Sequence, residues 1–319
     1  MELDVVTFGE AMAMFIAMEE GELESVSRFA KGLAGAEANV AVGLARLGFK
    51  VGWVSKVGND PLGKYIRMAL EREGVDIRQV ITDETRPTGL QLKSKVSEGD
   101  PQVHYFRKGS AASSMDVADF PEDYFFGARH LHMTGIPPAL SASMRHYAER
   151  AMDGMKAQGK TISFDPNLRP VLWKSVDEMV SVINQFAFHA DWVLPGLTEG
   201  RILTGYTKPQ DIAAFYLDRG VSLVAVKLGP KGAYYRTADG QEGWAAGFPV
   251  DRVVDTVGAG DGFAVGVISG KLEHLPIAEA VKRGNAIGAM AVMSPGDMDG
   301  LPSREELDEF LARNEARSL

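Results

Sequence analysis

The stretch Asp255-Thr256-Val257-Gly258-Ala259-Gly260-Asp261-Gly262-Phe263 leads from a turn of small residues directly into an apolar helical run that continues to Ile268. Backbone N–H groups at the start of a helix are free, and glycines let a ligand approach them closely. Such a turn can hold the negative charge that grows on a phosphoryl group during transfer. The stretch therefore predicts a helix that begins in the glycine turn, with an anion site at its first residues.

Asp261 lies in that same first turn and has two interpretations. A carboxylate beside a phosphate is misplaced unless it accepts a proton from the attacking hydroxyl. Alternatively, Asp261 caps the helix and interacts favourably with its dipole. For an isolated Gly-x-Gly-Asp the cap is the better interpretation. The rest of the sequence has to decide between the two.

The composition is that of a globular protein, and it excludes several kinds of site. Of 319 residues, 45% are hydrophobic and 24% charged. The absence of cysteine excludes disulfide scaffolds, cysteine-ligated zinc, iron–sulfur clusters and thiol nucleophiles. A net charge of −9 disfavours a general nucleic-acid partner. Any anionic substrate must therefore be met by a local group of basic residues.

Nothing in the sequence predicts a targeting or membrane segment. The start, Met1-Glu2-Leu3-Asp4, has neither the basic region nor the apolar core of a signal peptide. No apolar run reaches the roughly 18 residues that a membrane span needs. We therefore expect a cytoplasmic protein with no membrane partner.

Short apolar strands alternate with amphipathic helices, a pattern typical of a parallel sheet covered by helices. We expect a doubly wound α/β fold with a mostly parallel central sheet, in a single domain over residues 1–319. The expected strands are Val5–Gly9, Val51–Val57, His130–Thr134, Thr161–Asp165, Trp192–Leu194 and Leu223–Leu228. The expected helices are Glu37–Leu47, Leu62–Glu73, Ser141–Gln158, Val176–Phe188, Asp211–Arg219, Ala259–Gly270, Ile277–Met293 and Arg304–Asn314.

Two segments, residues 12–18 and 88–107, break this alternation and predict a small β-lid apart from the main sheet. In the second, Gln91, Lys93 and Lys95 alternate with Leu90, Leu92 and Val96, as in a half-exposed strand. An antiparallel edge of the main sheet is an equally good interpretation. Exposed apolar lid residues, Met12, Met14 and Leu92, would be protected by a second subunit, so we expect a homodimer or a larger oligomer.

Three ordered motifs carry a resemblance that covers nearly the whole chain. Together they resemble the ribokinase-like, or phosphofructokinase-B, family of carbohydrate kinases. This resemblance favours the interpretation of Asp261 as a base, and implies ATP and Mg²⁺. The motifs are Gly32-x-x-Gly35-Ala36-x-x-Asn39-x-Ala41 followed by Leu44-Ala45-Arg46-Leu47-Gly48, then Gly58-x-Asp60-x-x-Gly63, and finally Asp255-Thr256-x-Gly258-Ala259-Gly260-Asp261.

Further segments are similar to the 2-keto-3-deoxygluconate kinases of that family. The similarity implies transfer of the ATP γ-phosphate to a terminal hydroxyl of a keto-deoxy sugar acid. Fructokinase, ribokinase and 5-keto-2-deoxygluconate kinase remain alternatives, as does an inactive sugar-binding regulator. The segments are Gly35–Asn39, Tyr105–Ala111, His132–Ser141 and Asp165–Trp173.

The resemblance also implies roles on the sugar side. Asp261 accepts the hydroxyl proton, assisted by the amides of Gly258, Ala259 and Gly260. Two arginines suit an acidic sugar, because arginine grips a carboxylate bidentately. Gln91 departs from the aromatic residue that is common at its position. The substrate residues implied are Gly35, Ala36, Asn39, Gln91, Tyr105, Arg107, Ile136, Arg169, Asp261 and Asp297.

The resemblance implies a nucleotide side and cations as well. Magnesium is held mostly by ATP phosphates and water. In the family's Asn-x-x-Glu motif, Gly196 replaces the Asn while Glu199 remains. A monovalent cation such as K⁺ is implied near Asp255 and the loop Ser294–Asp297, held by backbone carbonyls. The nucleotide residues implied are Asn167, Arg169, Lys227, Gly229, Lys231, Gly232, Gly258, Gly260 and Asn285.

Overall fold

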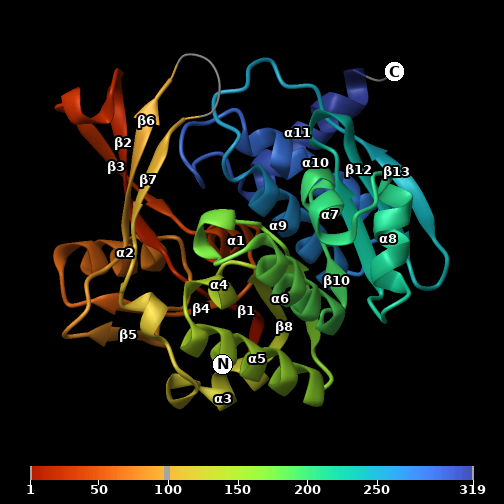
Figure 1. The fold of residues 1–319 in the computed structure, drawn as a ribbon. Helices are drawn as coiled ribbons and strands as arrows, with labels where there is room; N and C mark the ends of the chain where they lie inside the picture. The colour runs from red at the N-terminus through yellow and green to blue at the C-terminus, as the bar shows by residue number, and fades with distance from the viewer. Residues whose placement is uncertain (1, 97–100, 318–319) are drawn as a thin grey trace.

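The fold, a computed structural model that describes residues 2–96 and 101–317, is built on a nine-stranded sheet (Figure 1). The spatial order is β13-β12-β11-β10-β9-β8-β1-β4-β5, and all neighbours from β11 to β5 are parallel. Only the pairs β11–β12 and β12–β13 are antiparallel. The strands are β1 (Leu3–Phe8), β4 (Val51–Gly58), β5 (Val80–Asp83), β8 (Ala128–Thr134), β9 (Thr161–Asp165), β10 (Trp192–Val193), β11 (Leu223–Lys227), β12 (Gly232–Thr237) and β13 (Glu242–Ala246).

Helices cover both faces of this sheet and create two separate cores, so the predicted doubly wound α/β fold is confirmed. One core lies under α1 (Ala36–Arg46), α2 (Pro61–Arg72), α9 (Ala259–Leu272), α10 (Ile277–Ala291) and α11 (Arg304–Arg317). The other lies under α3 (Glu122–Phe126), α4 (Pro137–Leu140), α5 (Ala142–Ala157), α6 (Val176–His189), α7 (Leu197–Thr204) and α8 (Pro209–Leu217).

Local chemistry explains where the helices begin. The Asp60 side chain accepts a hydrogen bond from the Gly63 amide, and Pro61 occupies the first position of α2. Ser141 and Ser175 cap α5 and α6 in the same way. The central strands are buried on both faces, as expected of parallel strands between two helical layers, although one face of β8 and β9 carries polar side chains such as His130, His132 and Ser163.

A second, four-stranded sheet stands apart from the main one, at the upper left of Figure 1. Residues 12–18 lie in it, as do 90–95 and 103–106 of the second segment, so the alternative of an edge of the main sheet is wrong; residues 97–100 lie outside the described part. β3 was missed from sequence. The strands are β3 (Phe29–Ala34), β2 (Met12–Glu20), β6 (Leu90–Lys95) and β7 (Val103–Phe106), with β2 and β6 parallel.

The polar face of β6 is not where the alternation predicted it. Gln91 and Lys93 are only 4% and 3% exposed, because this face looks into a polar cavity rather than into solvent. Met12 and Met14 are also buried within the chain, so the prediction that they form an exposed apolar face is wrong. Within residues 2–96 and 101–317, no helix is long and apolar enough to cross a membrane.

Candidate active site

Two adjoining cavities of about 350 Å³ each share Lys227, at the carboxyl end of β11 in the main sheet. The first lies under the small sheet and is lined by many charged side chains. The second is lined mostly by glycines and apolar residues of the loops and helices near β13. Lys227, Thr256 and Gly260 line both cavities. A group bound between these three residues can therefore be reached from either side.

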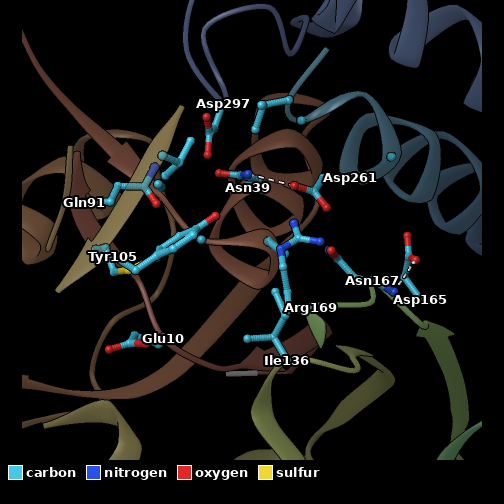
Figure 2. A pocket seen from close by; sticks show the side chains of 18 of the residues that line it. Glu10, Asn39, Gln91, Tyr105, Ile136, Asp165, Asn167, Arg169, Asp261 and Asp297 are labelled. Atoms are coloured by element: carbon cyan, nitrogen blue, oxygen red, sulfur yellow. Dashed lines mark hydrogen bonds between the residues drawn. The ribbon is translucent and has the colours of Figure 1, made fainter. Parts of the chain in front are cut away.

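All of the predicted substrate residues line the first cavity, including Asp261 (Figure 2). They come from distant parts of the chain: α1, β6, β7, the loops after β8 and β9, the start of α9 and the loop after α10. Parallel strands bring such loops together at one edge of the sheet. The residues are Gly35, Ala36, Asn39, Gln91, Tyr105, Arg107, Ile136, Arg169, Asp261 and Asp297.

Asp261 is buried at the start of α9, but it does not cap that helix. The cap position belongs to Gly258, whose φ of 84° is left-handed and favours glycine. The Asp261 carboxylate instead accepts a hydrogen bond of 2.8 Å from the Asn39 amide (Figure 2). Burial raises the pKa of Asp261 to about 7, although the hydrogen bond from Asn39 acts in the opposite direction and lowers it. The carboxyl group can therefore gain or lose a proton near neutrality.

The start of α9 packs closely against its neighbours, most of all at Gly258, where no side chain fits. A Cβ on Gly258 would lie 2.2 Å from the carbonyl oxygen of Asp297, and one on Gly260 would lie 3.3 Å from Lys227 Nζ. Lys227 also forms a buried ion pair of 2.5 Å with Asp165. Burial alone would lower the pKa of Lys227, but the Asp165 carboxylate raises it, so the ammonium stays charged. A positive side chain thus faces the predicted anion site.

The two arginines differ in what they contact. Arg107 donates through Nε, at 2.6 Å, to the buried carboxylate of Glu10, and its Nη2 lies equally close. Arg107 therefore lines the cavity as one member of a buried ion pair, and not as a free cation. Arg169 donates only to the neighbouring carbonyl of Leu168 at 3.0 Å, and among the described residues it has no ion-pair partner. Arg169 is the cation best able to meet an anion.

Glu37, on α1, is a buried acid that sequence reasoning missed. Its Oε1 accepts a hydrogen bond from the Thr134 hydroxyl, while Oε2 has no partner and packs against Gly9. Burial raises the pKa of Glu37 from 4.5 to about 7, although the Thr134 hydrogen bond and the charges of Arg107 and Arg169 lower it. Near neutrality much of this side chain is therefore protonated.

Replacing Glu37 by Gln is expected to flatten the dependence of stability on pH. Because the folded pKa lies above the unfolded one, the wild-type chain loses stability as pH rises from 4.5 to about 7, by about 3 kcal/mol. The amide does not ionise, so the variant lacks that loss. Urea unfolding of both proteins at pH 5 and pH 8 measures the difference; equal pH dependence would contradict the assignment.

The second cavity contains most of the residues predicted only for the nucleotide side. A Cβ on Gly232 would lie 2.0 Å from the Ala245 carbonyl oxygen, so the chain here needs glycine to approach β13. Gly229, Gly232 and Asn285 line the cavity as predicted, but Lys231 lines neither cavity. Asn285 uses its amide group to donate to the carbonyls of Ala245 and Ala246. It holds β13 in place and forms part of the wall.

Asn167, predicted on the nucleotide side, lines the first cavity instead, and Arg169, predicted on both sides, lines the first cavity only. Both lie in the loop after β9. Asn167 has a positive φ of 39°, which Asn tolerates better than most residues. Their position beside Lys227 leaves them able to face the γ-phosphate end of a nucleotide, although not its base.

The two residues predicted near metal ions already have partners for both carboxylate oxygens. Glu199 accepts hydrogen bonds from the amides of Leu168 and Gly196, at 2.8 and 2.7 Å. Asp255 accepts from the Val257 amide and pairs with Lys93. No group of three or more potential metal-binding side chains occurs in the part of the chain that is described. Glu199 does line the first cavity, so its predicted place near magnesium stays a prediction, as does an ion held by carbonyls near Asp255.

Sequence reasoning missed Glu10, Lys93 and Asp165 as residues of the site. Glu10 and Asp165 stand at the carboxyl ends of β1 and β9, where ligands bind in open α/β sheets, so that rule could have found both. Lys93 gave no such signal, because its alternation with apolar residues is typical of a solvent-exposed face. His130 and His132, in β8, are buried, and both are hydrogen-bonded to Ser163.

Comparison with known proteins agrees with this geometry. The 2-dehydro-3-deoxygluconokinase of Bacillus subtilis (strain 168) is 61% identical over 313 residues, covering 98% of this chain and 96% of the relative. The crystal structure of a PfkB protein from Polaromonas sp. JS666 has 53% identity and a TM-score of 0.89, covering 96% of this chain and 99% of that one. A putative ribokinase II from E. coli in complex with ATP and Mg²⁺ has 29% identity and a TM-score of 0.90, covering 98% and 99%.

Residues 2–304, nearly the whole chain, match the family described as pfkB family carbohydrate kinase. The glycine turn, the buried aspartate at its end and the two adjoining cavities all lie within the matched region. This chain belongs to the pfkB family of carbohydrate kinases.

Proposed function

We propose that this kinase phosphorylates 2-keto-3-deoxygluconate, also called 2-dehydro-3-deoxygluconate, at its terminal hydroxyl, using ATP. The product is 2-keto-3-deoxy-6-phosphogluconate. The observation that carries the proposal is the unpaired guanidinium of Arg169 in the same cavity as the buried carboxylate of Asp261. A cation without a partner suits a sugar acid, and 61% identity to a 2-dehydro-3-deoxygluconokinase supports that choice.

In the proposed reaction the sugar lies in the first cavity and ATP in the second. Asp261 accepts the proton of the sugar hydroxyl as that oxygen attacks the γ-phosphorus, and the bond to the β-phosphate oxygen breaks in line. The hydrogen bond from Asn39 holds the carboxylate in the required orientation. Positioning of the two substrates supplies much of the acceleration.

Charge on the moving phosphoryl group is met where the cavities adjoin. The start of α9, from Gly258 to Asp261, lies where the cavities adjoin and offers its free amides to such a group, and Lys227 adds a charged ammonium. Magnesium, held mainly by the nucleotide phosphates and water, would neutralise further charge there. We assign Asn167 and Arg169 to the phosphate end of the nucleotide as well, so Arg169 serves both substrates.

We further propose that the small sheet is a lid over the sugar, within a single kinase domain that spans residues 1–319. Closure would exclude water, which competes with the sugar as phosphoryl acceptor. Met18, Val96 and Phe106 are exposed on this sheet or next to it, so we propose that it pairs with a second copy in a homodimer. We place the kinase in the cytoplasm, where its co-substrate ATP is made, without a nucleic-acid or membrane partner.

The activity should depend on pH through Asp261. With its pKa raised to about 7 by burial, the base is ionised above that pH and protonated below it. We expect kcat/KM for the sugar to fall about tenfold per pH unit below about 7 and to be level above it. A pH–rate profile measured from pH 5 to 9 at constant ionic strength tests this; a level profile through pH 6 would contradict it.

The sugar assignment is tested by ATP consumption over a panel of acceptors. The panel holds 2-keto-3-deoxygluconate, its galactonate epimer, 5-keto-2-deoxygluconate, fructose and ribose. We expect the highest kcat/KM with 2-keto-3-deoxygluconate. Preference for fructose or ribose would overturn the role of Arg169 but leave the kinase standing. No ATP consumption with any of the sugars, while the sugars still bind, would favour the inactive sugar-binding regulator.

A further inference from the structure

Lys93 is a buried ammonium in the middle of β6, and it ties the small sheet to the main body of the protein. Its side chain is 3% exposed. Nζ contacts the carboxylate of Asp255 and lies 3.3 Å from Oδ1 of Asp297. Both carboxylates are themselves less than a tenth exposed. Ordering a lysine in this way is costly unless its partners are fixed, so the three groups form one unit.

The two carboxylates belong to loops that together shape the start of α9. Asp255 also accepts a hydrogen bond of 3.0 Å from the Val257 amide, directly before the glycine turn. Asp297 presses its carbonyl oxygen against Gly258, where a Cβ would lie only 2.2 Å away. A displacement of either loop would therefore move Gly258, and with it the amides that meet the phosphoryl group.

Asp297 also belongs to the sugar side. Its carboxylate points into the first cavity (Figure 2), which Lys93 lines too, and neither residue lines the nucleotide cavity. Because Lys93 occupies Oδ1, the contact leaves Asp297 able to accept a hydrogen bond from a sugar hydroxyl through its other oxygen. Lys93 lies between these two buried carboxyl groups, so removing the lysine leaves them close together without a cation.

We propose that Lys93 is a positioning residue for phosphoryl transfer. It holds the Asp255 and Asp297 loops against each other and against the small sheet. The Asp297 carboxylate and the glycine turn before α9 are thereby placed together in the geometry that the reaction needs. This inference depends on the proposed function in one respect, the choice of 2-keto-3-deoxygluconate as the sugar in the assay. It assigns a contact between the small sheet and the phosphoryl site to the Lys93 side chain.

The test compares Lys93→Met with Lys95→Met in the full-length protein, using 2-keto-3-deoxygluconate and ATP. Lys95 lies on the same strand but is exposed, and among the described residues its ammonium donates to the Met18 carbonyl at 3.2 Å. We expect Lys93→Met to lower kcat/KM for the sugar by about 100-fold or more, since it leaves a buried charge cluster unbalanced. Lys95→Met should stay within about twofold of wild type. ATP binding without sugar should change less than about threefold in both.

Two further variants separate positioning from folding. Lys93→Arg keeps the charge and should recover at least about tenfold of the lost kcat/KM. Lys93→Ala should regain activity when methylammonium is added, because the vacated site opens on the cavity. The inference is overturned if Lys93→Met behaves like Lys95→Met. It is also overturned if ATP binding and melting temperature fall together with activity and neither arginine nor methylammonium restores turnover. If the wild type prefers another sugar, the proposed function fails, and the same comparison is made with that sugar.

Discussion

Replacement of Asp261 by Asn is expected to lower kcat by about 10³- to 10⁴-fold, the upper range for loss of a general base. Asn keeps the size of the side chain and can still accept the hydrogen bond from Asn39, but it cannot take up the hydroxyl proton. Steady-state kinetics with 2-keto-3-deoxygluconate and ATP measure the loss, and calorimetry checks that both substrates still bind.

Asp299→Asn is the matched control, because Asp299 is exposed and lines neither cavity. It should leave kcat within about twofold of the wild-type value. If Asp261→Asn retained more than a tenth of wild-type turnover, the Asp261 carboxylate would not be the base. Its contact with Asn39 would then have only a structural role.

Replacement of Arg169 by Met is expected to lower kcat/KM for the sugar acid by about 10³-fold, since a charged contact in a desolvated cavity is lost. The decisive quantity is the ratio of kcat/KM for 2-keto-3-deoxygluconate to that for fructose. If the Arg169 guanidinium binds the sugar carboxylate, its removal makes this ratio fall, because fructose has no carboxylate and loses no such contact. Steady-state kinetics with both sugars supply the ratio.

The control here is Arg145→Met, whose guanidinium contacts Glu178 and lies outside both cavities. It should not change the ratio. Equal losses with both sugars in Arg169→Met would mean that Arg169 acts only on the phosphate. The acid specificity would then have to come from Arg107, in spite of its ion pair with Glu10.

The sequence predicted the parts of the fold that follow from local pattern. α9 begins at Ala259, inside the glycine turn, because small residues and a left-handed Gly258 precede an apolar run. The alternation of strands and helices likewise predicted most of the main sheet. β3 was missed because Phe29-Ala-Lys-Gly-Leu-Ala34 lacks a clear alternation, and its pairing with β2 supplies the strand.

The residues that line the site could be predicted from sequence where they belong to a motif. Contacts between segments that lie far apart in the sequence could not be predicted in this way. Alternation along β6 showed which side chains share a face, but not whether that face meets water or a polar cavity. The pair between Lys93 and Asp255 joins residues 162 positions apart, and no local pattern carries that information. For the same reason the partner of Arg107 was not foreseen: Glu10 lies on another loop, 97 positions away.

The central claim is that the γ-phosphate of ATP is transferred to the terminal hydroxyl of a keto-deoxy sugar acid. The most direct measurement is ³¹P NMR of a reaction that contains the purified protein, ATP, Mg²⁺ and 2-keto-3-deoxygluconate. The account predicts one new phosphate monoester, coupled to the protons of a single CH₂ group, in amounts equal to the ADP formed. Inorganic phosphate in place of the ester, or no consumption of ATP, would contradict it.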